Sequence, residues 1–278
     1  MEYGTLVSTD VVAEHLSDPN WVICDCRHDL MDINAGRRAY EESHLPGAHF
    51  LHLDEDLSGV KTGQNGRHPL PEPESLAAKL GRLGINDATQ VIAYDAQGGV
   101  FAARLWWLLR WLGHAAVAVM DGGVPQWIAE RKPLAKEPPS VRPALFERRP
   151  GVLPVNATFV LTHLDGKGMQ LVDARSPDRF AGQNETLDPV AGHIPTALNR
   201  FFKLNLDEQG RFKSSNVLHD EFAALLADRS PKEVVHQCGS GVTACHNLLA
   251  MEHAGLAGSR LYPGSWSEWC ADSGRPIA

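Results

Sequence analysis

The sequence repeats itself. Each half of the 278-residue chain contains a short apolar stretch that ends in Asp-x-Arg, then a His-x-Pro-x-Ala turn. Each half also ends with a glycine that is followed five residues later by a tryptophan. These motifs stand at 21–27 and 170–175, at 44–48 and 193–197, and at 122–127 and 264–269. Several motifs in a shared order at near-constant spacing predict a duplicated domain.

Each half contains a second apolar strand, at 89–95 and at 233–238, which is followed by glycines and an apolar helical stretch. The clearest helical stretches are 105–112 and 244–253. Strands that alternate with helices predict parallel sheets covered by helices. The expected fold is therefore α/β, with two tandem domains that each contain a small parallel sheet flanked by helices.

A proline-rich stretch separates the two halves. It begins as Ala-Lys-Glu-Pro-Pro-Ser-Val-Arg-Pro, and two more prolines follow at positions 150 and 154. Prolines at this density oppose both helix and central strand, and they suit an extended connector. We expect an N-terminal domain at 1–134, a linker at 135–155 and a C-terminal domain at 156–278.

The composition excludes several classes of protein. The net charge of −8 argues against nucleic-acid binding, which usually requires a basic face. No apolar run approaches the ~18 residues of a membrane span, and the N-terminus lacks the pattern of a secretory signal. The five cysteines match no zinc-binding spacing. We therefore expect free thiols in a reducing cytoplasm, and neither a metal nor a cofactor.

The segment 234–246, Val-Val-His-Gln-Cys-Gly-Ser-Gly-Val-Thr-Ala-Cys-His, carries the strongest chemical signal. Cys238 stands directly after a buried strand, two glycines follow it, and then a helix begins. Ligands of open α/β sheets bind at the carboxyl ends of strands. Glycines let successive N–H groups turn toward one atom, and the helix N-terminus adds positive potential. This context favours a nucleophilic thiolate at Cys238. The equivalent position in the first half is Asp95, so only the second domain is expected to be a cysteine catalyst.

With these motifs, the chain resembles the two-domain rhodanese-type sulfurtransferases, and most closely their 3-mercaptopyruvate branch. The resemblance covers essentially the whole chain, and its specific part is the loop Cys-Gly-Ser-Gly-Val-Thr at 238–243. It implies that Cys238 accepts a sulfur atom, carries it as a persulfide, and delivers it to a thiol or cyanide. The N-terminal domain is implied to be catalytically silent and to help wall the cleft.

The resemblance also implies roles for other residues. Arg179, in Ser-Pro-Asp-Arg-Phe, matches the family arginine that binds the anionic group of the donor, a task that suits the two parallel hydrogen bonds of a guanidinium. Arg175 is expected to be structural and to pair with Asp173. The loop residues whose amides would hold the sulfur are Gly239, Gly241, Val242 and Thr243.

A proton relay is implied for Ser240, with His68 and Asp54 from the N-terminal half as its partners. Such a relay would shuttle a proton to the pyruvate leaving group. The neighbouring His52 and Asp56 are alternatives to Asp54.

One position departs from the branch. A second arginine is common nine residues after the first, but this chain has Asp188 there. Carboxylate binding would then depend on Arg179, on backbone amides, or on a replacement such as Arg200. This departure puts 3-mercaptopyruvate in doubt as the preferred donor.

Three other functions compete with this interpretation. A thiosulfate sulfurtransferase is the nearest, but its loop often carries Arg or Lys, and this loop has neither. A cysteine phosphatase needs Cys-x5-Arg, and Ala244 stands where that arginine would be. A persulfide carrier that serves a partner protein would also need Cys238. The expected partners are a small anionic sulfur donor, a thiol or cyanide acceptor, and a thioredoxin-like reductant, with no nucleic acid and no membrane.

Overall fold

The computed structural model describes residues 2–278, which divide into two compact units. Unit 1 comprises the chain up to residue 59 with residues 71–152 and 208–211, and unit 2 comprises 60–70, 153–207 and 212–278. The exact domain boundaries drawn from the sequence stay a prediction. Between the units' regular elements, residues 136–156 form no helix or strand. Among residues 2–278, no helix combines the length and the apolar character that crossing a bilayer requires.

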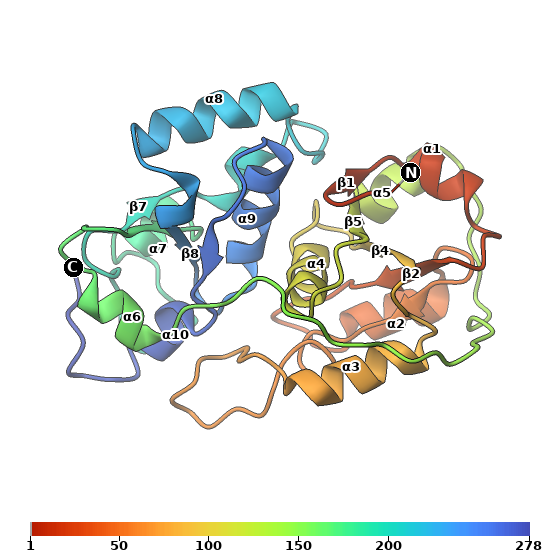
Figure 1. Ribbon diagram of the computed structural model, residues 1–278, viewed down its shortest axis with the longest axis horizontal. Coiled ribbons are helices and arrows are strands. Elements are labelled where there is room, and N and C mark those ends of the chain that lie inside the picture. The colour runs from red at the N-terminus through yellow and green to blue at the C-terminus, as the bar shows by residue number, and fades with distance from the viewer. Residues whose placement is uncertain (1) are drawn as a thin grey trace. The chain divides into compact units, whose positions relative to one another are not determined.

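Unit 1 contains a five-stranded sheet in the order β1-β5-β4-β2-β3, and every pairing in it is parallel. Its strands are β1 (Leu6–Val7), β2 (Trp21–Asp25), β3 (His49–Phe50), β4 (Gln90–Tyr94) and β5 (Val117–Met120). Its helices are α1 (Thr9–Glu14), α2 (Ala35–Glu42), α3 (Pro73–Arg82), α4 (Ala102–Trp111) and α5 (Gly123–Ala129) (Figure 1).

Unit 2 contains a four-stranded parallel sheet in the order β7-β6-β8-β9. Its strands are β6 (Gln170–Asp173), β7 (Leu198–Asn199), β8 (Val234–Gln237) and β9 (Arg260–Leu261). Its α-helices are α6 (Ala157–Thr162), α7 (Pro177–Phe180), α8 (Ser215–Leu226), α9 (Thr243–His253) and α10 (Ser265–Trp269), and its 3-10 helices are η1 (Phe202–Asn205) and η2 (Pro231–Glu233) (Figure 1). The predicted α/β fold with two flanked parallel sheets is confirmed.

Helices cover both faces of each sheet. Successive side chains of a strand point to opposite faces, so apolar side chains on both faces must be covered. In unit 1, Ile92 and Tyr94 pack with α1 and α5 in one core cluster, while α4 contacts β4 and β5. In unit 2, Leu171 and Val235 pack with α6 and α10, while α9 contacts β8 and β9. Helix α9 is buried almost throughout, from Ala244 to Met251, which explains its apolar sequence.

The repeated Asp-x-Arg motif has the same structural role in both units. Arg27 donates to Asp25 at 2.6 Å, and Arg175 donates to Asp173 at 2.7 Å, with both carboxylates fully buried. The same guanidinium nitrogen also donates to the carbonyl that precedes the His-x-Pro turn, at Ser43 in unit 1 and Gly192 in unit 2. The motif therefore ties a central strand to the turn that follows it, as expected for a structural Arg175.

Candidate functional site

Cys238 lies at the carboxyl end of β8, at the start of the loop that leads into α9. Its side chain is buried, and its Sγ accepts a hydrogen bond from the Gly241 backbone N–H at 3.2 Å. The Cys238 N–H donates to Ser265 Oγ at 3.1 Å, and its carbonyl accepts from Trp266 N at 3.0 Å. The sulfur is therefore held by a rigid backbone and faces at least one amide donor, as an anionic sulfur requires.

The tight curl of this loop depends on Gly241. Its φ of +77° lies in the left-handed region, and a Cβ atom at this position would lie 2.3 Å from the Pro263 carbonyl oxygen. Only glycine meets both conditions. Val242 then caps α9 and Thr243 begins it, so the positive end of an eleven-residue helix lies next to the loop.

Ser240 contacts a histidine from a distant part of the sequence. His68 Nδ1 lies 2.7 Å from Ser240 Oγ, and both side chains are buried. The segment 60–70, which carries His68, belongs to unit 2, where the Arg67 N–H donates to Ser267 Oγ at 3.0 Å. The structure therefore brings together two of the three predicted relay residues.

Asp54 belongs to unit 1, and its place in a relay stays a prediction. Its Oδ2 lies 3.8 Å from His28 Nε2, and His52 lies in the same cluster. His52 Nδ1 accepts from the Asp54 N–H, and His52 Nε2 lies 2.8 Å from the Ile33 carbonyl. Because both ring nitrogens of His52 are engaged with the backbone, this cluster does not offer a set of three metal ligands.

Arg179 lies on the short helix α7, and its guanidinium is held by two carboxylates. Its Nε and Nη2 donate to Glu185 at 3.0 and 2.9 Å, and Nη2 also lies 3.4 Å from Asp188 Oδ2. Arg179 also faces the active loop, since a Cβ atom on Gly239 would lie 3.6 Å from Arg179 Nη2. The predicted donor-binding arginine is therefore adjacent to the residue that follows Cys238.

Asp188, the residue that departs from the family pattern, has a side chain that is 2% exposed and forms an ion pair with Arg67. Burial raises the pKa of Asp188, while the guanidiniums of Arg67 and Arg179 oppose that rise. Burial acts in the same direction on the Glu185 carboxyl, but there the hydrogen bonds from Arg179 and the Leu187 amide prevail, so the pKa is lowered. The sequence interpretation did not include Arg67 or Glu185 among the site residues.

Arg200, the replacement considered from the sequence, occupies a different environment. Its guanidinium donates to Asn205 Oδ1 and to Glu221 at 2.5 Å, and it lies over the Phe222 ring. These contacts connect η1 to α8. Arg67, and not Arg200, is the additional arginine that the structure places beside the loop.

The two cysteines of unit 1 are buried and unreactive thiols. Cys24 and Cys26 are fully buried in and just after β2. Burial, together with the neighbouring Asp25 carboxylate, raises the pKa of Cys24 to about 12, and burial raises the pKa of Cys26 as well. Both therefore stay protonated at neutral pH, in agreement with a role in the core.

Asp95 occupies the position in unit 1 that Cys238 has in unit 2. Its carbonyl accepts from Val124 N at the start of α5, just as that of Cys238 accepts from the start of α10. Its carboxylate accepts four backbone N–H bonds, from Gln97, Gly99, Phe101 and Ala102, at 2.8 to 3.0 Å. Burial raises the pKa of Asp95, and these four bonds oppose the rise. The loop of unit 1 thus surrounds a carboxylate that belongs to the chain itself.

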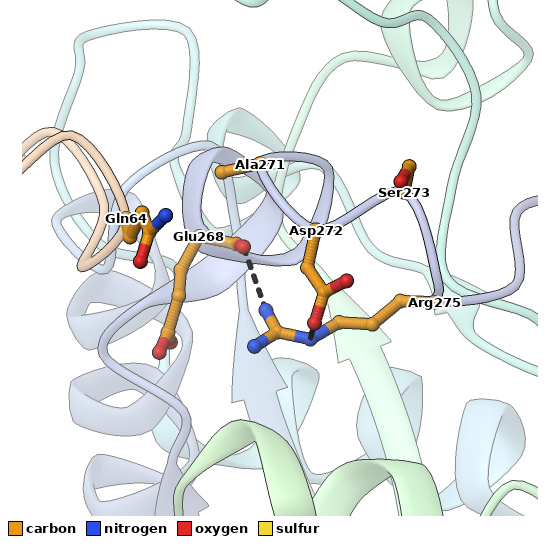
Figure 2. Close-up of a pocket in the computed structure, with 6 residues that line it drawn as sticks. All are labelled: Gln64, Glu268, Ala271, Asp272, Ser273 and Arg275. Carbon is orange, nitrogen blue, oxygen red and sulfur yellow. Dashed lines mark hydrogen bonds and ion pairs between the residues drawn. The ribbon is translucent and has the colours of Figure 1, made fainter.

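A polar hollow of about 280 Å³ lies elsewhere in unit 2 (Figure 2). Figure 2 shows Arg275 turned toward Glu268, whose carbonyl it contacts at 2.6 Å, and toward Asp272. Gln64 lines the same hollow. The predicted site residues do not line it, so the chemistry suggested by Cys238 is not assigned to this hollow.

The geometry defines a tandem α/β protein whose second unit presents a cysteine in an amide-lined loop at the carboxyl end of a strand. The model of the rhodanese-like domain matches this chain twice, at residues 8–130 and 156–272, and the chain belongs to this family. The predicted duplication and the resemblance are both confirmed.

Relatives along the whole chain have sulfurtransferase names. A probable 3-mercaptopyruvate sulfurtransferase of Pseudomonas aeruginosa is 46% identical over 281 residues, which cover 100% of this chain and 99% of the relative. The thiosulfate sulfurtransferase of Bos taurus is 34% identical, with 96% and 92% covered. The solved structure of the 3-mercaptopyruvate sulfurtransferase from Leishmania major superposes with a TM-score of 0.86 at 28% identity, covering 98% of this chain and 76% of that one.

Proposed function

We propose that this sulfurtransferase takes the sulfur atom of 3-mercaptopyruvate, holds it as a persulfide on Cys238, and passes it to a thiol or cyanide. In the first step the Cys238 thiolate attacks the donor sulfur and the carbon–sulfur bond of the donor breaks. The bonding electrons leave with the carbon as the enolate of pyruvate, and the proton of the donor thiol ends on that carbon. The products are pyruvate and a persulfide anion, so atoms and charge balance.

The observation that supports this donor is the 2.7 Å contact between Ser240 and His68, beside the loop of Cys238. An enolate is strongly basic and needs a proton as it leaves, whereas the sulfite released from thiosulfate is a stable anion. A hydroxyl in contact with an imidazole is a suitable proton route. The pair is therefore useful for 3-mercaptopyruvate and has no comparable task with thiosulfate.

The persulfide is tested by intact-mass spectrometry of the whole protein after exposure to 3-mercaptopyruvate. We expect a gain of one sulfur, ~32 Da, that disappears when cyanide is added. Cys238→Ser should show no gain, and the matched control Cys270→Ser should gain sulfur like the unaltered protein. A protein that gains no sulfur, or a gain that persists in Cys238→Ser, would contradict the mechanism.

Thiosulfate is the second candidate donor, because a relative that matches 96% of the chain has that name. The two donors are separated by His68→Ala. General acid–base groups contribute roughly 10²-fold or more, so kcat/KM should fall by about that factor with 3-mercaptopyruvate and by much less with thiosulfate. An equal loss with both donors would remove the support for the proton route. Asp54→Asn tests the predicted third relay residue in the same assay.

The acceptor side of the reaction is also a proposal. A small thiol or cyanide, or a thioredoxin-like protein, would attack the outer sulfur of the Cys238 persulfide and regenerate the thiolate. Turnover with a small acceptor alone distinguishes an enzyme that completes its own cycle from a persulfide carrier that requires a partner protein. A cytoplasmic location stays a prediction from the cysteine content.

A further inference from the structure

Two guanidinium groups converge on the residue that follows the nucleophile. A Cβ atom on Gly239 would lie 2.8 Å from Arg67 Nη2, and 3.6 and 3.8 Å from Nη2 and Nη1 of Arg179. The absence of a side chain on Gly239 lets both guanidinium groups approach the loop this closely. An anion bound by these nitrogens would lie over the residue that follows Cys238.

Contacts within unit 2 fix the position of Arg67. Its backbone N–H donates to Ser267 Oγ, and its Nη1 forms the ion pair with Asp188. The other terminal nitrogen, Nη2, is the one that faces Gly239. Because a guanidinium is planar and rigid, anchoring one nitrogen also sets the direction of the other.

Arg179 is divided in the same way. Glu185 occupies the edge formed by its Nε and Nη2, and the two terminal nitrogens, Nη2 and Nη1, lie 3.6 and 3.8 Å from the Cβ position of Gly239. Each arginine is thus anchored by a buried carboxylate and directs a terminal nitrogen toward the active loop. Two nitrogens from two arginines suit the two oxygens of one carboxylate.

We infer that Arg67 is a donor-binding residue which, together with Arg179, holds the carboxylate of an α-keto thiol donor over Gly239. Arg67 takes the place of the second arginine that the resemblance would put at position 188. Asp188 is the positioning residue that holds Arg67 in that orientation. This inference rests on the proposed function for the identity of the donor.

The test separates binding from sulfur transfer. Affinity for 3-mercaptopyruvate is measured by calorimetry on Cys238→Ser, which binds the donor without consuming it. Adding Arg67→Ala should weaken binding by tenfold or more, since a charge-assisted hydrogen bond is lost. The matched control Arg229→Ala removes an arginine that precedes β8, at the opposite end of the strand from Cys238, and should leave the affinity unchanged.

Arg67→Lys distinguishes binding from anchoring. A lysine has a single charged nitrogen, which can pair with Asp188 but cannot also reach a donor over Gly239. We expect Arg67→Lys to recover the thermal stability that Arg67→Ala loses, but not the affinity for 3-mercaptopyruvate. Full recovery of affinity in Arg67→Lys would show that Arg67 only anchors the loop and would overturn the inference.

Two further results would also overturn it. One is an affinity of the Arg67→Ala protein within twofold of its parent. The other is the lack of saturable binding to the Cys238→Ser parent while the unaltered protein still forms a persulfide. Failure of the proposed function shows separately, because the mass gain on Cys238 is measured on the unaltered protein and does not depend on Arg67.

Discussion

The buried carboxylate of Asp188 should influence which donor the enzyme prefers, and Asp188→Asn isolates its charge. The variant retains the shape and a hydrogen-bond acceptor toward Arg67 but removes one negative charge. Asp188 Oδ2 and the Cβ position on Gly239 lie 3.4 and 3.6 Å from the same nitrogen, Nη2 of Arg179. The Cβ position on Gly239, which marks the place proposed for the donor anion, therefore lies at most about 7 Å from the carboxylate oxygen, by addition of these two distances.

Two unit charges roughly 7 Å apart repel each other by about 2.4 kcal/mol at an effective dielectric constant of about 20. The side chains of Arg67 and Arg179 are 30% and 19% exposed, so solvent screens part of this repulsion. We therefore reduce it to about 1 kcal/mol per unit of donor charge. Thiosulfate carries one more negative charge than 3-mercaptopyruvate, so it is repelled by about 1 kcal/mol more. This difference corresponds to roughly a fivefold change in the relative kcat/KM of the two donors.

The assay is steady-state sulfur transfer to cyanide with each donor. In Asp188→Asn, the ratio of kcat/KM for thiosulfate to that for 3-mercaptopyruvate should rise about fivefold. Asp220→Asn makes the same change of net charge at a side chain that is 87% exposed, and it should leave the ratio unchanged. An unchanged or lower ratio in Asp188→Asn would refute the electrostatic reasoning.

The same argument predicts a pH dependence. Because burial raises the pKa of Asp188, acidification protonates this carboxyl before an ordinary aspartate and removes the same charge. The ratio measured for the unaltered protein should therefore rise toward that of Asp188→Asn as the pH falls. Glu185 and the guanidiniums of Arg67 and Arg179 surround this group. The Asp188→Asn variant lacks only the Asp188 charge, so the difference between the two proteins gives the part of the pH dependence that is due to Asp188.

Two further predictions concern stability. Burial lowers the pKa of His236 from its ordinary 6.5 to about 3, so this histidine stays neutral in the folded state. The unfolded chain binds a proton there below pH 6.5, so the free energy of unfolding should fall by about 2 kcal/mol between pH 7 and pH 5. Urea unfolding of His236→Leu should show correspondingly less loss over the same pH range. Gly241→Ala should lower the free energy of unfolding by about 2 kcal/mol or more, because it combines a left-handed backbone with a contact to the Pro263 carbonyl. The control Gly168→Ala, at φ +70° with no atom within 4 Å, should show only the smaller backbone cost.

Local patterns predicted the features that are local in the structure. The Asp-x-Arg pairs, the strand before Cys238 and the glycine turn after it each extend over a few residues. The conformational preferences of short segments, such as strand alternation and glycine turns, therefore predict them without knowledge of distant contacts. The repeat also predicted that both units would have the same architecture, because two copies of one motif series fold by the same rules.

The contacts of Arg67 could not be predicted in this way. Arg67 and Asp188 are 121 residues apart in the sequence, and nothing in the segment 60–70 indicates that it packs into unit 2. One signal was present: an aspartate at position 188, where the resemblance suggests arginine, implies a compensating positive charge nearby. The sequence interpretation proposed Arg200 for that charge, but Arg200 is committed to Glu221.

The four amides around Asp95 show how a loop that corresponds to the Cys238 loop is held by a charge of the chain itself. Buried backbone N–H groups need an acceptor, so a loop that turns several of them toward one point requires a negative or polar group there. Asp95 provides that partner from within the chain, so these four donors are already satisfied. Unit 1 thus meets with one fixed carboxylate the demand for an acceptor that unit 2 leaves to the Cys238 sulfur.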